Sequence, residues 1–158
     1  MWPGCGLRRV SCGATVSSSA GGSTTGAAVV NVDYALAPRA AMDAIARQVR
    51  AAIAWVWREA GSFNGDPARI HVAGHSAGAH LAAMAALTAW DGFAPGLPAN
   101  AVKSALAISG VYALEPVRLS YLNEALRLDA AAARRNSPAF FARKGAAPLA
   151  LAVGAGET

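Results

Sequence analysis

The spacing of apolar side chains changes several times along this chain, and each change marks an expected element. Residues 27–34 form a short apolar, β-rich run, which predicts a buried strand. From residue 40 to Gly61 apolar side chains recur every three or four positions, which predicts an amphipathic helix of about five turns. Apolar runs at 70–73, 102–109 and 148–153 predict three more strands, and the first is followed by a helical pattern to about residue 90. This alternation is typical of a parallel α/β sheet with right-handed crossovers.

Two segments do not fit this alternation. Residues 1–26 are rich in serine, glycine and threonine and hold neither period, so we expect them to be poorly ordered. We therefore expect the α/β domain to cover residues 27–158. Residues 111–146 contain only short helical patterns, and we expect this long connection at the sheet edge where the strands' carboxyl ends and ligands meet.

Composition narrows the function classes. The chain has 158 residues, enough for one domain, and is 54% hydrophobic with 15% charged residues, which suits a packed core. The net charge of +5 comes from scattered arginines, so we expect no nucleic-acid partner. No apolar run reaches the roughly 18 residues of a membrane span, so we expect no membrane association and a cytoplasmic protein. The two cysteines, Cys5 and Cys12, lack metal-ligand spacing, and we expect no metal.

The most informative stretch is the G-x-S-x-G sequence at residues 74–78, between a predicted strand and a predicted helix. In that context Ser76 sits on a sharp strand-to-helix turn, a nucleophile elbow, with its hydroxyl exposed above the sheet. Gly74 and Gly78 flank it because a Cβ there would crowd the strand or the helix, and His75 completes the motif. The amide of Ala77 then points to where a tetrahedral oxyanion would form. The alternative is a serine in a glycine-rich turn without chemistry.

A serine nucleophile needs a base and an acid, which follow it in this fold in the order acid, then histidine. Glu157 comes directly after the last predicted strand and is our candidate acid, the alternative being a solvated loop carboxylate. The three histidines, His71, His75 and His80, all precede Glu157, and we interpret them as supporting residues. We therefore expect the chain as printed to lack its base and to be inactive or nearly so.

Several segments resemble α/β-hydrolase esterases, beginning with residues 30–38, the 74–78 motif and His80. Five further segments resemble the kynurenine formamidase (arylformamidase) branch of these enzymes: residues 109–112, 114–116, 119–123, 137–138 and 153–158. The resemblance covers about residues 26–158. It implies hydrolysis of N-formyl-kynurenine or activated aryl esters, with Ser76 as nucleophile and Glu157 in the position of the triad acid. The family's His-Gly-Gly-x-Trp loop and C-terminal histidine are not found in this sequence, and we expect a fragment.

These inferences give one expectation for fold and two for function. We expect part of a doubly wound parallel sheet of the α/β-hydrolase fold, with helices on both faces. The first function is a cofactor-free serine hydrolase that acts on small-molecule esters or formamides through an acyl-enzyme on Ser76. The second is an inactive fragment or binding module that retains the elbow by descent. The sequence is compatible with a homo-oligomer as well as with a monomer.

Overall fold

A computed structural model describes residues 12–17 and 27–156 of the chain, and of residues 12–17 it describes the backbone alone. In chain order the helices and strands are β1 Cys12–Ser17, β2 Ala27–Val32, α1 Met42–Glu59, β3 Ile70–His75, α2 Ala77–Ala86, α3 Trp90–Phe93, β4 Val102–Ile108, α4 Glu115–Arg118, α5 Asn123–Leu126, α6 Ala130–Arg135 and β5 Leu149–Ala152. Short 3₁₀ turns occupy Ala60–Phe63, Pro67–Arg69 and Pro138–Phe140. The expected α/β alternation is confirmed.

The strands form one sheet in the order β2-β1-β3-β4-β5. Strands β3, β4 and β5 are parallel neighbours, as expected, whereas β1 pairs antiparallel with both β2 and β3. Our expectation that residues 1–26 are poorly ordered is wrong for residues 12–17, which form an interior strand of the sheet. The backbone N–H and C=O groups of β1 are paired with those of β2 and β3. Amino-acid composition does not reveal such pairing between strands. The rest of that N-terminal stretch lies outside the described residues.

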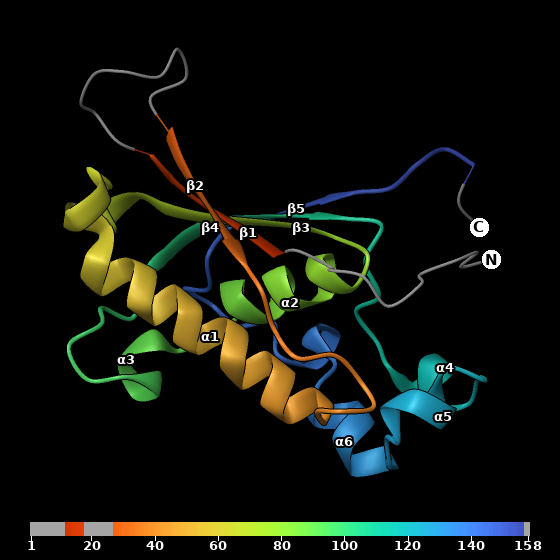
Figure 1. The fold of residues 1–158 in the computed structure, drawn as a ribbon. Helices are drawn as coiled ribbons and strands as arrows, with labels where there is room; N and C mark the ends of the chain where they lie inside the picture. The colour runs from red at the N-terminus through yellow and green to blue at the C-terminus, as the bar shows by residue number, and fades with distance from the viewer. Residues whose placement is uncertain (1–11, 18–26, 157–158) are drawn as a thin grey trace.

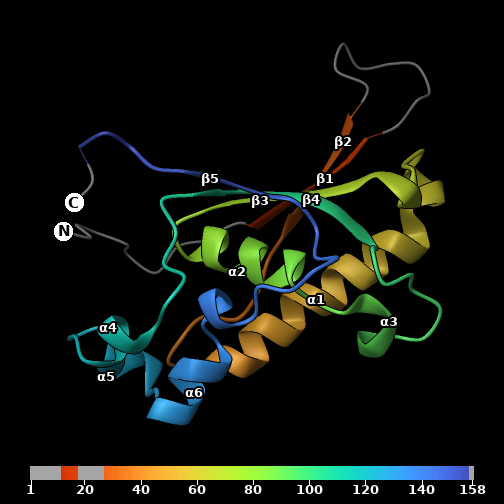
Figure 2. The same ribbon diagram turned by 180° about the vertical axis from the view of Figure 1, so that it is seen from behind.

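All described helices lie on one face of the sheet, which differs from the expectation of helices on both faces (Figures 1 and 2). The strand order explains this arrangement, because β2, β3, β4 and β5 advance across the sheet in one direction. Right-handed crossovers that advance in one direction place all their helices on the same face. On the opposite face Leu106 and Ile108 of β4 are 41% and 37% exposed. Crossover helices appear on the second face only where the order of parallel strands reverses, and β2, β3, β4 and β5 show no reversal.

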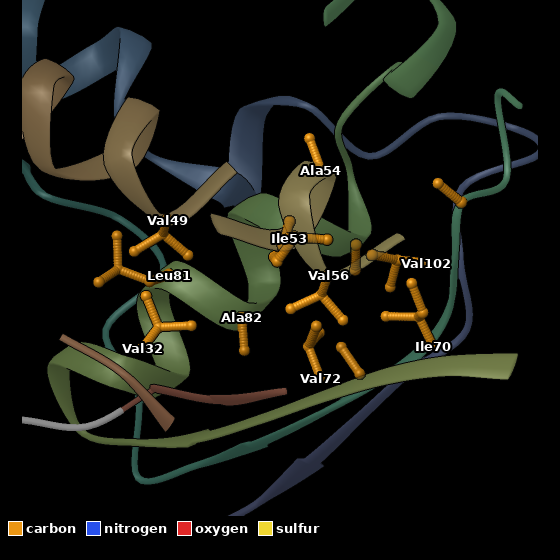
Figure 3. Close-up of a cluster of buried hydrophobic side chains, with 14 of the residues drawn as sticks. Val32, Val49, Ile53, Ala54, Val56, Ile70, Val72, Leu81, Ala82 and Val102 are labelled. Carbon is orange, nitrogen blue, oxygen red and sulfur yellow. The ribbon is translucent and has the colours of Figure 1, made fainter. Parts of the chain in front are cut away.

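The main core lies between this sheet and helices α1 and α2 (Figure 3). The α1 side chains Ile45, Val49, Ile53 and Val56 are buried, which confirms the helical spacing expected from the sequence. Helix α2 is buried on nearly all sides because it packs between α1 and the sheet. No helix among the described residues is both long enough and apolar enough to cross a bilayer.

The connection between β4 and β5 folds into its own small cluster of Leu114, Leu128, Ala132 and Ala133. It is attached to the start of α1 by the Arg135 guanidinium, whose Nη2 lies 2.8 Å from Oδ2 of Asp43. The hydrogen bond from Arg135 is the main reason that the pKa of Asp43 is lowered. The connection, far from α1 in sequence, is thus held beside its N-terminus.

Candidate active site at the turn between β3 and α2

Ser76 occupies the sharp turn between β3 and α2 and has the backbone angles φ 56° and ψ −117°. These angles match the first central position of a type II′ turn, which strongly favours glycine. Two hydrogen bonds hold the residue there. Its N–H donates to the carbonyl of Ile108 at 2.9 Å, and its own carbonyl accepts from the His80 N–H at 3.2 Å. A strained serine held between a strand and a helix is the geometry of a nucleophile elbow.

The approach of β3 to α2 accounts for Gly74. A Cβ built on Gly74 would overlap the carbonyl of Gly78 and lie 2.8 Å from the amide nitrogen of Ala79. Both obstacles are backbone atoms of α2, which cannot move without shifting the helix. The sequence argument that a side chain at residue 74 would crowd the helix is therefore supported by the geometry.

Ala77 begins α2, directly after Ser76. The first four amides of a helix are not used by its own hydrogen bonds, and the helix dipole favours negative charge at that end. The Ala77 amide thus lies at the positive end of the α2 dipole, directly after Ser76, and its role as an oxyanion donor stays a prediction.

The three histidines are placed differently around this turn. His80 is 3% exposed, and its Nδ1 lies 2.8 Å from the carbonyl oxygen of Val111. His71 pairs its Nδ1 with Oγ of Ser104 on the neighbouring strand at 2.7 Å. His75 is exposed at the end of β3. Among the described residues, no histidine nitrogen is hydrogen-bonded to Ser76, so the structure brings none of the three to the serine as a base.

Glu157 itself lies outside the described residues, but the strand that leads to it is described. Register pairs His75 with Ile108 and Ile108 with Ala152, so β3, β4 and β5 end at the same level. The end of β5 is two strands from the elbow, roughly 10 Å at ordinary strand spacing. The chain therefore leaves β5 at the edge where Ser76 stands, and the position of the Glu157 carboxylate stays a prediction.

The loop 109–112 after β4 is also part of this edge, and the sequence analysis included it in the resemblance without giving it a role at the site. Ser109 has a φ of 52°, and a Cβ on Gly110 would lie 2.8 Å from Cβ of Ala79 in α2. The hydroxyl of Tyr112 points back to the Ala107 carbonyl at 3.4 Å, and burial raises the pKa of that phenol. A Ser-Gly pair directly after an apolar strand was the available signal for a tight turn here.

Comparison with known families and curated proteins identifies relatives. The family model described as BD-FAE matches residues 13–157, so the likeness begins earlier than the residue 26 that we expected. A kynurenine formamidase from Danio rerio is 39% identical over 116 residues, which are 73% of this chain and 37% of that protein. Esterase LipQ from Mycobacterium tuberculosis is 43% identical over 88 residues, 54% of this chain and 21% of that protein.

Solved esterase structures share the fold. Fungal esterases from Rhizomucor miehei match with a TM-score of 0.63 at 27% identity, covering 80% of this chain and 46% of theirs. An esterase from Pyrobaculum calidifontis matches with a TM-score of 0.58 at 29% identity, covering 78% and 46%. The chain thus spans about half the length of these structures and little more than a third of the fish formamidase.

Proposed function

The chain belongs to the BD-FAE family and is an α/β-hydrolase of the esterase and arylformamidase type, and from this premise we propose that it carries the nucleophile of a serine hydrolase. The substrates are carboxylic esters or aryl formamides of the N-formyl-kynurenine kind. The observation that carries the proposal is the strained backbone of Ser76 at the start of α2. The names of the relatives, kynurenine formamidase and esterase, support the substrate class.

In the proposed reaction the Ser76 oxygen attacks the carbonyl carbon of the substrate while a base takes the hydroxyl proton. The tetrahedral oxyanion accepts a hydrogen bond from the Ala77 amide, and the dipole of α2 favours its charge. Collapse expels the alcohol or aryl amine, which takes up the proton, and leaves an ester of Ser76. Water then attacks that acyl-enzyme and releases the acid, which is formate when the substrate is a formamide.

The base and its acid complete the proposal. His71 and His80 are bonded to Ser104 and to the Val111 carbonyl, so we propose that neither is the base. Glu157 is the proposed acid, since β5 delivers the chain to the elbow's edge. An acid there would hold an imidazole in the correct tautomer and stabilise its charged form.

The proposal is tested with Ser76→Ala in the full protein that carries this chain, using p-nitrophenyl acetate and an N-formyl aryl amine as substrates. Turnover should fall by about three decades or more, the usual effect of removing a triad member. Ser62→Ala is the matched control, because the Ser62 hydroxyl only caps a nearby carbonyl on the surface. Equal hydrolysis by parent and Ser76→Ala would remove Ser76 from the reaction.

The engagement of His71 and His80 also favours the second candidate, a fold that keeps the elbow without hydrolysis. The 158-residue chain alone separates the two. We expect it to hydrolyse p-nitrophenyl acetate at far below the roughly 10 per second of an ordinary enzyme. Ser76-dependent turnover near that rate would mean that a group within this chain serves as base.

A further inference from the structure

His80 is a buried polar side chain in an otherwise apolar helix. It is 3% exposed, and its neighbours in α2 are alanines, Leu81 and Met84. A leucine or methionine would suit this environment without the cost of burying ring nitrogens. Packing therefore does not explain why a histidine stands at this position, one helical turn after Ser76.

The hydrogen-bond pattern determines how the ring is protonated. Nδ1 lies 2.8 Å from the Val111 carbonyl oxygen, which can only accept, so Nδ1 carries the hydrogen. Nε2 is fully buried and has no hydrogen-bond partner among the described residues. Burial lowers the pKa of His80, because removing the ring from water disfavours its charged form. His80 is thus neutral and donates one hydrogen bond, through Nδ1.

The acceptor of this bond belongs to the 109–112 loop at the edge of the site. The hydrogen bonds that hold that loop include three to other parts of the described chain. The Ser109 N–H donates to β5 at 2.8 Å, the Ala139 N–H donates to the Tyr112 carbonyl at 2.9 Å, and His80 donates to Val111. Of these three bonds, only the one from His80 comes from α2, the helix that follows the nucleophile.

We propose that His80 is a positioning residue whose Nδ1–H holds the 109–112 loop against the first turn of α2 and so fixes the loop beside Ser76. Two hydrogen bonds support this role, and their donors are about one helical turn apart. Ser76 donates to Ile108, the last residue of β4, and His80 donates to Val111 just beyond it. The close approach of Gly110 to Ala79 lies between them. The effect on catalysis rests on the proposed function, whereas the hydrogen bond from His80 to Val111, called the tie below, does not.

Amide hydrogen exchange of the intact protein, followed by NMR, tests the tie. His80→Leu fills the buried site with an apolar side chain that has no N–H, whereas His80→Asn places an amide N–H at the position of Nδ1. With leucine, exchange at the Ser109 and Ala139 amides should rise about tenfold relative to Ala105, which lies in the middle of β4 and donates to Pro148. Asparagine should restore most of the protection.

His71→Ala is the matched control, since it removes a histidine hydrogen bond to Ser104 within β4, the strand that precedes the 109–112 loop. It should leave Ser109 and Ala139 unchanged. Unchanged exchange in His80→Leu overturns the tie. If the leucine variant does not fold, the ring nitrogen resonances of the parent decide, because a hydrogen on Nε2 in place of Nδ1 also overturns it.

The positioning role is measured on the same variants with p-nitrophenyl acetate. His80→Leu should lower kcat about tenfold or more with little change in KM, and His80→Asn should recover most of the loss. A loosened loop with unchanged kcat overturns the positioning role. If the full protein that carries this chain shows no Ser76-dependent hydrolysis, the proposed function is refuted, and the exchange result still accepts or rejects the tie.

Discussion

Replacing Gly74 by alanine should weaken the whole fold, because the added methyl group has nowhere to go. The new Cβ would overlap the Gly78 carbonyl and lie 2.8 Å from the Ala79 nitrogen. These are backbone atoms in a helix that is itself packed between α1 and the sheet, so β3 and α2 must separate. Overpacking a well-filled core costs typically 1–3 kcal/mol, and obstacles made of backbone place Gly74→Ala at about 3 kcal/mol.

Urea denaturation of the parent and the variant gives this difference in the free energy of unfolding. Gly61→Ala is the matched control, because a Cβ on Gly61 meets nothing within 4 Å. That substitution should be neutral or stabilise the fold by up to about 1 kcal/mol, since alanine restricts the unfolded chain. A cost below about 1 kcal/mol for Gly74→Ala would refute the close contact between strand and helix.

Three further outcomes follow from the contacts. Asp43→Asn should lower stability by about 1 kcal/mol, because it breaks a half-exposed bidentate pair with Arg135. The lowered pKa of Asp43 means that this contribution is full above about pH 4 and disappears as the pH falls through the folded-state pKa, so urea titrations of parent and variant should converge in acid. Arg143→Ala should cost about 0.5–1 kcal/mol in thermal unfolding, since Arg143 donates to carbonyls at the end of α2, including that of Thr88. Ser76→Gly should stabilise the protein by about 1 kcal/mol while abolishing ester hydrolysis, and a loss of stability would contradict the strain at Ser76.

The elements with a strong local pattern were predictable from the sequence. The spacing of Ile45, Val49, Ile53 and Val56 determines α1 by itself, because one apolar stripe must face the core. The sharp turn at Ser76 was predictable because strand, Gly-x-Ser-x-Gly and helix occur together, and the backbone of Ser76 has the expected strain.

The features that were missed depend on contacts between distant segments. Strand β1 has a weak pattern of its own and is defined by its ladders to β2 and β3. The side of the sheet on which a crossover helix lies follows from strand order, which periodicity does not report. The tie from His80 to Val111 joins residues 31 positions apart, so no local motif could show it.

Serine at position 76 is better explained by chemistry than by folding. Gly74 is required by its close contact with the backbone of α2, so packing alone accounts for it. The backbone of Ser76 favours glycine, and a side chain there costs about 1–3 kcal/mol. Packing would therefore select glycine at this turn as well, yet the chain holds a serine, whose backbone donates a hydrogen bond to β4 and accepts one from α2, and these bonds maintain the strain. A hydroxyl kept at a cost in stability, beside the first amide of a buried helix, supports a nucleophilic role for this residue.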